Sequence, residues 1–169
     1  MKLSWAAVLV LMVSASCRQP VATSPPATSS DSAVREFVRL NLDNAVWRPA
    51  ENNTLGVMST VLEGDPSKQG FYLVVNRFPA GVMSRPHYHP DERHGLVIKG
   101  TWYTQEGDVF TTDGAVPLKP GDYMRHPAGG HHFDGALEEE VLVAISGYGP
   151  TSATVVDGGP LFGQAPTVK

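Results

Sequence analysis

The sequence has little cysteine and no excess of positive charge. Its single cysteine, Cys17, excludes a disulfide framework and a cysteine-rich zinc module within one chain, so any metal would depend on nitrogen and oxygen ligands. The 13 Lys and Arg residues are outnumbered by 17 Asp and Glu residues, and the formal net charge is -4. Because a phosphate backbone requires a cationic surface, we expect no nucleic-acid partner.

Two catalytic sequence motifs are also missing. The chain contains neither a G-x-x-x-x-G-K-S/T phosphate loop nor a G-x-S-x-G nucleophile elbow. A Walker-type nucleotide-binding protein and a hydrolase with such an elbow are therefore not supported.

Length and composition favour one small domain built from strands. A chain of 169 residues and 18.1 kDa can bury one ordinary core and is too short for two full domains. The 17 Gly and 14 Pro residues suit a chain that turns often, and they argue against a helical bundle or a coiled coil.

The N-terminal residues 1–16 have the pattern of a secretory signal peptide. Lys2 supplies a positive charge, residues 5–13 form an apolar run, and small residues follow. The run is too short to span a bilayer. A buried N-terminal helix is the alternative, but the polar, Pro-rich stretch that follows offers nothing to pack against it. The chain is therefore expected to be exported.

Cys17 directly follows the small residues 14–16, and this junction resembles the lipobox of bacterial lipoproteins, in which the cysteine is acylated. Ser14 departs from the pattern, since an aliphatic residue is usual there. The resemblance implies lipidation of Cys17, a location in the periplasm or cell envelope, and membrane contact only through the lipid anchor. A soluble periplasmic protein is the alternative.

The composition changes again after the predicted anchor. Residues 17–32 are rich in Pro, Ser, Thr and Ala and cannot bury enough apolar surface to fold, so we expect a disordered tether. The folded domain is expected to cover residues 33–169. Residues 38–43 alternate apolar and polar and predict a half-buried strand.

Further along, strand-sized apolar runs recur between turn signals. These runs cover residues 55–62, 71–78, 95–104 and 141–145. Antiparallel strands at this spacing form a sandwich or a barrel, so the predicted fold class is all-β.

All six histidines fall between residues 87 and 132. His87 and His89 stand at i and i+2, and such residues point to the same face of an extended strand, so both imidazoles can reach one ion. His126, His131 and His132 come from a later segment. Two adjacent hairpins could bring the two groups to one metal.

These segments resemble the two sequence motifs of the cupins. The first motif is matched by Gly81, His87, His89 and Gly100, and the second by Gly121, Pro127, Gly129 and His132. The resemblance extends over about residues 47–156, and this segment is similar to small bacterial single-domain cupins. It implies an antiparallel β-barrel of jelly-roll type with a metal inside one end, held by His87, His89 and His132.

The chain departs from the first motif where a glutamate ligand is expected, because Arg93 stands there. A guanidinium stays protonated and is no ordinary metal ligand. Glu92 and His94 are the candidates for a fourth ligand, although both would point to the opposite face of a regular strand unless a bulge turned them inward. Arg93, if it points inward, would offer a cation to an anionic substrate.

Three further side chains have weaker assignments. His131 neighbours His132 and should face the other side of an extended segment, at the barrel mouth or on the surface. His126 could face the cavity as a substrate contact or an acid/base group, or it could be a plain strand residue. Asp134 could orient a histidine.

Three imidazoles with at most one carboxylate suit Fe, Mn, Ni, Cu or Zn, and the ligand types do not separate these metals. One hypothesis is a metal-dependent oxidoreductase of dioxygenase type that acts on a small molecule; a zinc or manganese site could instead support isomerisation or hydrolysis. The alternative is a non-catalytic cupin that binds a metal or small ligand as an envelope sensor or accessory module. The resemblance also allows a homodimer.

Overall fold

A computed structural model describes residues 36–51 and 53–167 of the chain. The predicted signal peptide, Cys17 and the predicted tether lie outside the described residues. The chain divides into two units, residues 1–38 and 39–169, and the strands of the described ranges all belong to the second unit. Within the same ranges, no helix has the length and apolar character needed to cross a membrane.

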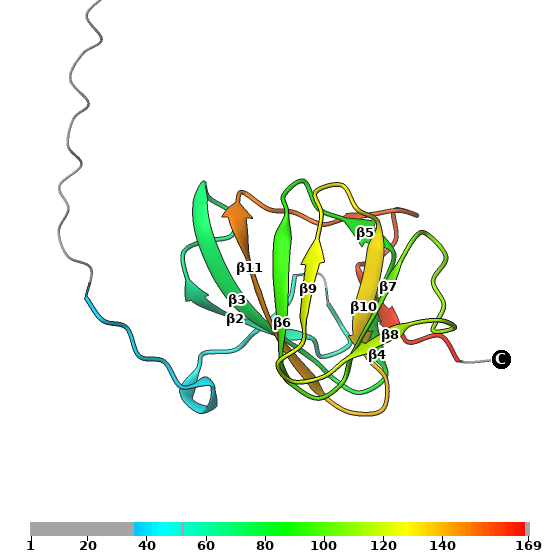
Figure 1. Cartoon of the computed structure of the whole chain (residues 1–169), viewed down its shortest axis with the longest axis horizontal. Helices are drawn as coiled ribbons and strands as arrows, with labels where there is room; N and C mark the ends of the chain where they lie inside the picture. The colour runs from blue at the N-terminus through cyan, green and yellow to red at the C-terminus, as the bar shows by residue number, and fades with distance from the viewer. Residues whose placement is uncertain (1–35, 52, 168–169) are drawn as a thin grey trace, which may run out of the picture. The chain divides into compact units, whose positions relative to one another are not determined.

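The second unit is built from two antiparallel sheets, which confirms the all-β prediction (Figure 1). The first sheet has six strands, in the spatial order β1 (Arg48–Pro49), β2 (Met58–Glu63), β3 (Gly70–Phe78), β11 (Val141–Gly149), β6 (Arg93–Lys99) and β9 (Tyr123–His126). The second sheet contains β12 (Thr154–Val155), β5 (His87–Tyr88), β10 (His132–Ala136), β4 (Val82–Ser84) and β13 (Phe162–Gln164), and it continues from β10 to β7 (Trp102–Glu106) and β8 (Val116–Leu118).

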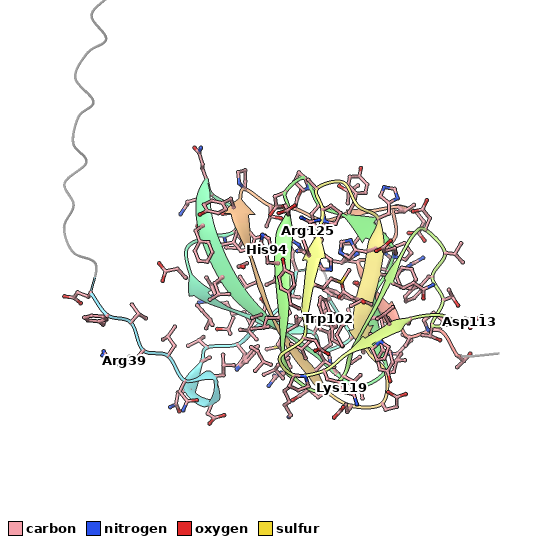
Figure 2. The ribbon with its side chains drawn as sticks, viewed as in Figure 1. Arg39, His94, Trp102, Asp113, Lys119 and Arg125 are labelled. Atoms are coloured by element: carbon pink, nitrogen blue, oxygen red, sulfur yellow. The ribbon has the colours of Figure 1, made fainter. Side chains whose placement is uncertain are left out.

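The hydrophobic core lies on the inner faces of these strands. On β11, Val141, Val143 and Ile145 alternate with more exposed residues and are almost fully buried. Trp102 on β7 is 1% exposed and lies in the same core cluster (Figure 2). Each such side chain contributes about 1.5–3 kcal/mol by burial. The period of two in the sequence therefore assigns the inner face correctly.

Two strand predictions need correction. The run over residues 95–104 is not one strand but two, β6 and β7, joined at Gly100. Gly100 has φ 75, and a Cβ at this position would lie 2.3 Å from the carbonyl oxygen of Glu140, so only glycine fits the turn. The sequence is apolar on both sides of Gly100 because β6 and β7 both contribute side chains to the core, so the two strands resemble a single apolar run.

The half-buried strand predicted at residues 38–43 was also wrong. The chain instead forms a short 3-10 helix, η1 (Leu42–Asn44), and Leu40 is exposed. The side chain of Asn41 accepts a hydrogen bond of 2.9 Å from the backbone N–H of Asp43. Such local side-chain bonds compete with strand formation.

Strand β10 brings the two histidine segments together. It pairs with β4 and β5 along one edge and with β7 along the other. In this register His132 is the direct partner of His87. The loop before β10 is tied to the same place, because the N–H of Gly129 donates to the carbonyl oxygen of His89 at 2.8 Å.

Candidate metal centre

His87, His89 and His132 converge inside the barrel. All three are less than 5% exposed. Their ring centroids are 4.8 Å apart for His87 and His89, 4.4 Å for His87 and His132, and 5.4 Å for His89 and His132. One ring nitrogen of each lies within 4.8 Å of the others. The tertiary structure thus assembles the three histidines that the two motifs single out.

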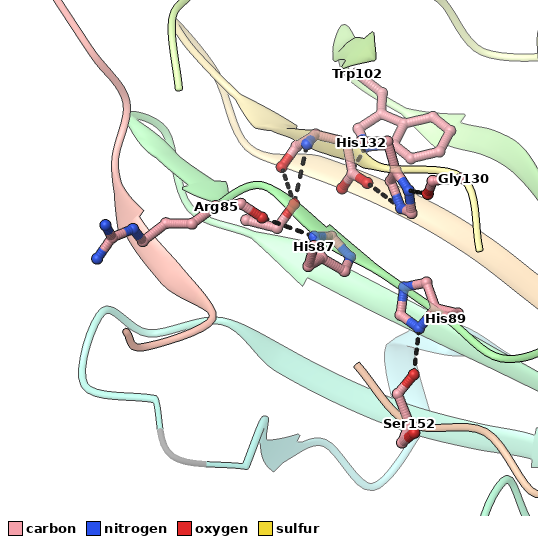
Figure 3. Close-up of polar contacts among 9 residues, drawn as sticks. Arg85, His87, His89, Trp102, Gly130, His132 and Ser152 are labelled. Atoms are coloured by element: carbon pink, nitrogen blue, oxygen red, sulfur yellow. Dashed lines mark hydrogen bonds and ion pairs between the residues drawn. The ribbon is translucent and has the colours of Figure 1, made fainter. Parts of the chain in front are cut away.

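Each of the three rings is oriented by a backbone carbonyl (Figure 3). The Nδ1 atoms of His87, His89 and His132 lie 2.7, 2.6 and 2.9 Å from the carbonyl oxygens of Arg85, Ser152 and Gly130, respectively. A carbonyl oxygen only accepts hydrogen bonds, so each Nδ1 carries the proton and donates it. In a neutral ring the lone pair is then on Nε2.

Burial keeps these rings neutral. It lowers the pKa of His87 to about 4, and the neighbouring His132 and Arg93 oppose protonation further. Burial lowers the pKa of His89 to about 2, again with a contribution from the charge of Arg93. The pKa of His132 is lowered by burial too, although Asp134 acts in the opposite direction. At neutral pH all three rings therefore offer a lone pair.

The donor set fits a transition metal. Nε2 of His89 and Nε2 of His132 are buried and have no hydrogen-bond partner among the described residues, a costly arrangement in an apolar interior unless an ion or ligand uses them. Neutral imidazoles whose other nitrogen is held by a carbonyl are the usual ligands of Fe, Ni, Cu and Zn. The three histidines have the chemistry that such an ion requires.

His126 faces the same cluster. It is 1% exposed, its ring stacks on His132 with centroids 4.0 Å apart, and it meets the edge of Trp102 at 5.7 Å. Both of its ring nitrogens are buried and have no hydrogen-bond partner within residues 36–51 and 53–167, and burial lowers the pKa of His126. With His132 and Asp134 it forms a second group whose donor atoms lie within 4.8 Å of one another. His126 is therefore placed beside the cluster rather than on the surface.

Arg93 also points inward. It shares its face of β6 with Gly95 and Val97, and Val97 belongs to the core. Its register partners are His126 on β9 and Gly147 on β11. Strand β6 is regular at this point. The position where the cupin motif has a glutamate therefore faces the site, and here it carries an arginine.

The two candidate fourth ligands are not brought to the cluster. His94 is paired with Arg125 across β6 and β9, both labelled in Figure 2, and its side chain is 43% exposed. Its Nδ1 bonds the hydroxyl of Tyr123 at 2.8 Å. Glu92 is 48% exposed and lies 3.6 Å from Nε2 of His94. No bulge turns β6 at these residues, so strand parity keeps both outside.

His131 faces outward, as the alternation predicts. Its ring stacks on Tyr88 with centroids 4.9 Å apart, and its Nδ1 bonds Asp108 at 2.5 Å. Asp134 is buried close to the site but does not hold the Nδ1 of a histidine. It accepts from Nε1 of Trp102 at 3.2 Å, and its other oxygen lies 3.8 Å from Nε2 of His132.

No sequence motif indicates Tyr72 and Asp91, which lie near Arg93. The hydroxyl of Tyr72 donates to Asp91 at 2.9 Å, and Asp91 also accepts from Thr151. Asp91 stands two residues before Arg93, and residues two apart in an extended chain point to the same face. This spacing could have indicated that the side chain of Asp91 points inward. The position of Tyr72 depends on the pairing of β3 with β11 and has no local signal.

Histidines of the cluster line two separate cavities. The inner one has a volume of about 60 Å³, and its polar wall includes His87, His89, Arg93 and Asp134. The outer one has a volume of about 440 Å³ and is lined by residues of β9 and β10, among them His126 and His132. His87 and His89 therefore face the smaller cavity, and His126 and His132 face the larger one.

A buried group of histidines inside an antiparallel β-barrel defines a protein of the cupin class. Residues 35–152 match the ChrR cupin-like domain. The chain belongs to this family and, with it, to the cupin superfamily. No curated protein matches the chain.

Solved structures share the fold at low sequence identity. The polyketide cyclase RemF from Streptomyces resistomycificus has a TM-score of 0.61 and 14% identity over 72% of this chain and 86% of its own. The DMSP lyase DddQ from Ruegeria pomeroyi has a TM-score of 0.54 and 21% identity over 66% of this chain, and the match spans only 61% of the lyase. A sugar phosphate isomerase of the cupin superfamily from Silicibacter pomeroyi has a TM-score of 0.52 and 23% identity over 73% of this chain and 96% of its own.

Proposed function

We propose that this chain is a metal-dependent cupin in which His87, His89 and His132 hold one divalent transition metal, and that it acts on a small molecule as an oxidoreductase of dioxygenase type. One observation carries the proposal: three buried, neutral imidazoles converge, and each is held by a carbonyl at Nδ1 so that Nε2 stays free. This arrangement is costly without an ion and favourable with one.

The metal would be Fe, Mn, Ni, Cu or Zn, since three imidazoles accept each of these ions. Such an ion would supply Lewis-acid chemistry and, if redox-active, chemistry with dioxygen. The chain's own residues orient the ligands, keep them unprotonated and exclude water from the interior. Arg93, Asp134 and His126 are other polar groups around the cluster that a substrate would meet.

The structural neighbours named above are a cyclase, a lyase and an isomerase, so the fold alone does not select oxygenation. A carbonyl-polarising reaction at a zinc or manganese centre is the nearest enzymatic alternative. A non-catalytic module that binds a metal or small ligand is the alternative from another class, and it is consistent with an inner cavity of only about 60 Å³.

Metal analysis tests the site directly. Wild type and His87→Ala, purified without added metal, are compared by elemental analysis for metal per chain. We expect about one ion per wild-type chain and a large loss in His87→Ala. His131→Ala is the matched control, because this histidine neighbours His132 but faces outward. Equal metal content in wild type and His87→Ala would overturn the proposed centre.

Turnover separates the two classes of function. Oxygen uptake by wild type is measured against catechols, flavonols and diketones, with His87→Ala as the metal-poor control. Uptake that depends on His87 supports the dioxygenase. Absence of turnover with all three substrate classes in metal-loaded protein would favour the binding module.

A further inference from the structure

Arg93 places a cation inside the barrel beside the histidines. The charge of its guanidinium contributes to the lowered pKa values of His87, His89 and His126, so it acts on the whole cluster. It lines the inner cavity together with His87 and His89. A ligand in this cavity therefore meets both the histidines and the guanidinium.

Part of the guanidinium of Arg93 has no hydrogen-bond partner in the described part of the chain. Nε of Arg93 is buried without a hydrogen-bond partner, and among residues 36–51 and 53–167 Arg93 forms no ion pair. Two carboxylates lie near the guanidinium: Asp91 accepts from two hydroxyl groups, and Asp134 accepts from the indole of Trp102. Asp91 and Asp134 favour the charged form of the guanidinium, and Asp134 lines the same cavity. The Nε–H of Arg93 is nevertheless a buried donor without an acceptor, which is unfavourable unless a ligand supplies one.

The rest of the cavity wall indicates what kind of ligand would fit beside Arg93. Its apolar part consists of Phe78, Val143, Ile145, Leu161 and Phe162, and its polar part also includes Asn76, Ser84 and Asp134. Phe78 and Phe162 meet edge to face with centroids 6.0 Å apart. The volume of about 60 Å³ has room for only a few water-sized groups. The cavity therefore suits a short molecule with one charged end and a small apolar end.

We infer that Arg93 is the recognition residue for a short organic carboxylate, which is bound with its carboxylate at the guanidinium and its apolar end towards Phe78 and Phe162. The planar guanidinium fork pairs with a carboxylate through two parallel hydrogen bonds. The claim that this carboxylate is the substrate of the proposed centre rests on the proposed function. The pairing of a carboxylate with Arg93 itself needs no metal.

Calorimetric titration of the full chain with propionate tests the inference, in zinc-loaded and metal-free protein. Propionamide, which has the same shape and no charge, is the matched ligand. Arg93→Gln removes the buried charge, and Arg125→Gln is the matched control because Arg125 is an exposed arginine on the neighbouring strand. We expect propionate to bind at least tenfold more weakly to Arg93→Gln, with no change in Arg125→Gln and no binding of propionamide to wild type.

The outcomes separate this inference from the metal proposal, because metal content is measured for every sample. Equal propionate binding by wild type and Arg93→Gln, or equal binding of propionate and propionamide by wild type, overturns the anion site even if the metal is present. Wild type without metal overturns the proposed centre, while propionate binding that requires Arg93 still supports the inference. If Arg93→Gln does not fold, Arg93→Lys replaces it, because lysine keeps the charge and removes the guanidinium fork. The comparison of propionate with propionamide on wild type then decides whether the site requires an anion.

Discussion

His87 and His132 are direct partners across β5 and β10, with ring centroids 4.4 Å apart. The candidate centre therefore depends on the register of one strand pair. A shift of one residue along β10 would point His132 away from the site and turn His131 towards it. The pairing of β10 with β4, at Gly135 and Met83, holds the same register.

Gly135→Ala should disturb this pairing. A Cβ at Gly135 would lie 2.5 Å from both the Cα of Met83 and the carbonyl oxygen of Val82, which are backbone atoms that cannot move aside. We expect a loss of about 3 kcal/mol in the free energy of unfolding, measured in urea, together with weaker metal binding. Gly114→Ala is the control, because it also has positive φ but no atom within 4 Å. Equal losses in both variants would show that the close approach of β4 and β10 is unimportant.

Arg93→Glu should convert the site into one with four protein ligands. The glutamate would face inward at the position where the cupin motif has its carboxylate ligand, and it would replace a repelling cation by an attracting anion. We expect metal affinity, measured by competition with a chelator, to rise at least about tenfold. The metal-free variant should be less stable than wild type, because it buries an unpaired carboxylate. Glu92→Gln should leave affinity unchanged, and an unchanged affinity in Arg93→Glu would mean that residue 93 does not reach the ion.

The metal-free protein should lose stability in mild acid. Burial lowers the pKa of His87 to about 4 and that of His89 to about 2, whereas an unfolded chain titrates near 6.5. The unfolded state thus binds more protons below pH 6.5, and stability that is fully present above this pH declines as pH falls towards 4. By pH 5 each ring costs about 2 kcal/mol. Urea unfolding between pH 7 and 5 measures the slope, which should flatten in His87→Gln; a flat wild-type profile would contradict the buried neutral rings.

His126→Phe distinguishes a bystander from a ligand. Phenylalanine keeps the ring contacts with His132 and Trp102 and removes two buried nitrogens that have no hydrogen-bond partner in the part of the chain that the structure describes. We expect the metal-free variant to be more stable by about 1 kcal/mol, with metal content as in wild type. Loss of the metal in this variant would instead assign the ion to the group formed by His126, His132 and Asp134.

Cys17→Ser tests the proposed lipid anchor, which depends on the sequence alone. If Cys17 is acylated after export, the substitution should move the protein from the membrane fraction to the soluble periplasmic fraction, because one hydroxyl cannot replace the acyl chains. Immunoblots of cell fractions measure the distribution, and His131→Ala is a control that leaves the signal intact. An unchanged distribution would rule out the anchor.

The order of the residues is enough to predict the all-β class and, through the resemblance to the two cupin motifs, to name the three histidines that the fold brings together. Alternation assigns inner and outer faces because side chains of a strand have a period of two, and this placed His87 and His89 on one face. The same rule indicates that His94 and Glu92 share the face opposite to Arg93.

The groups that surround these three histidines are set by the packing of distant strands. His126 and Arg93 lie beside the cluster because β9, β6 and β11 pair in one register, and no local pattern encodes the register of strands far apart in the sequence. Nor could the sequence show that the ring of each ligand is held by a backbone carbonyl, since every residue has one. Local periodicity sets the direction of a side chain, whereas its neighbours are set by long-range pairing.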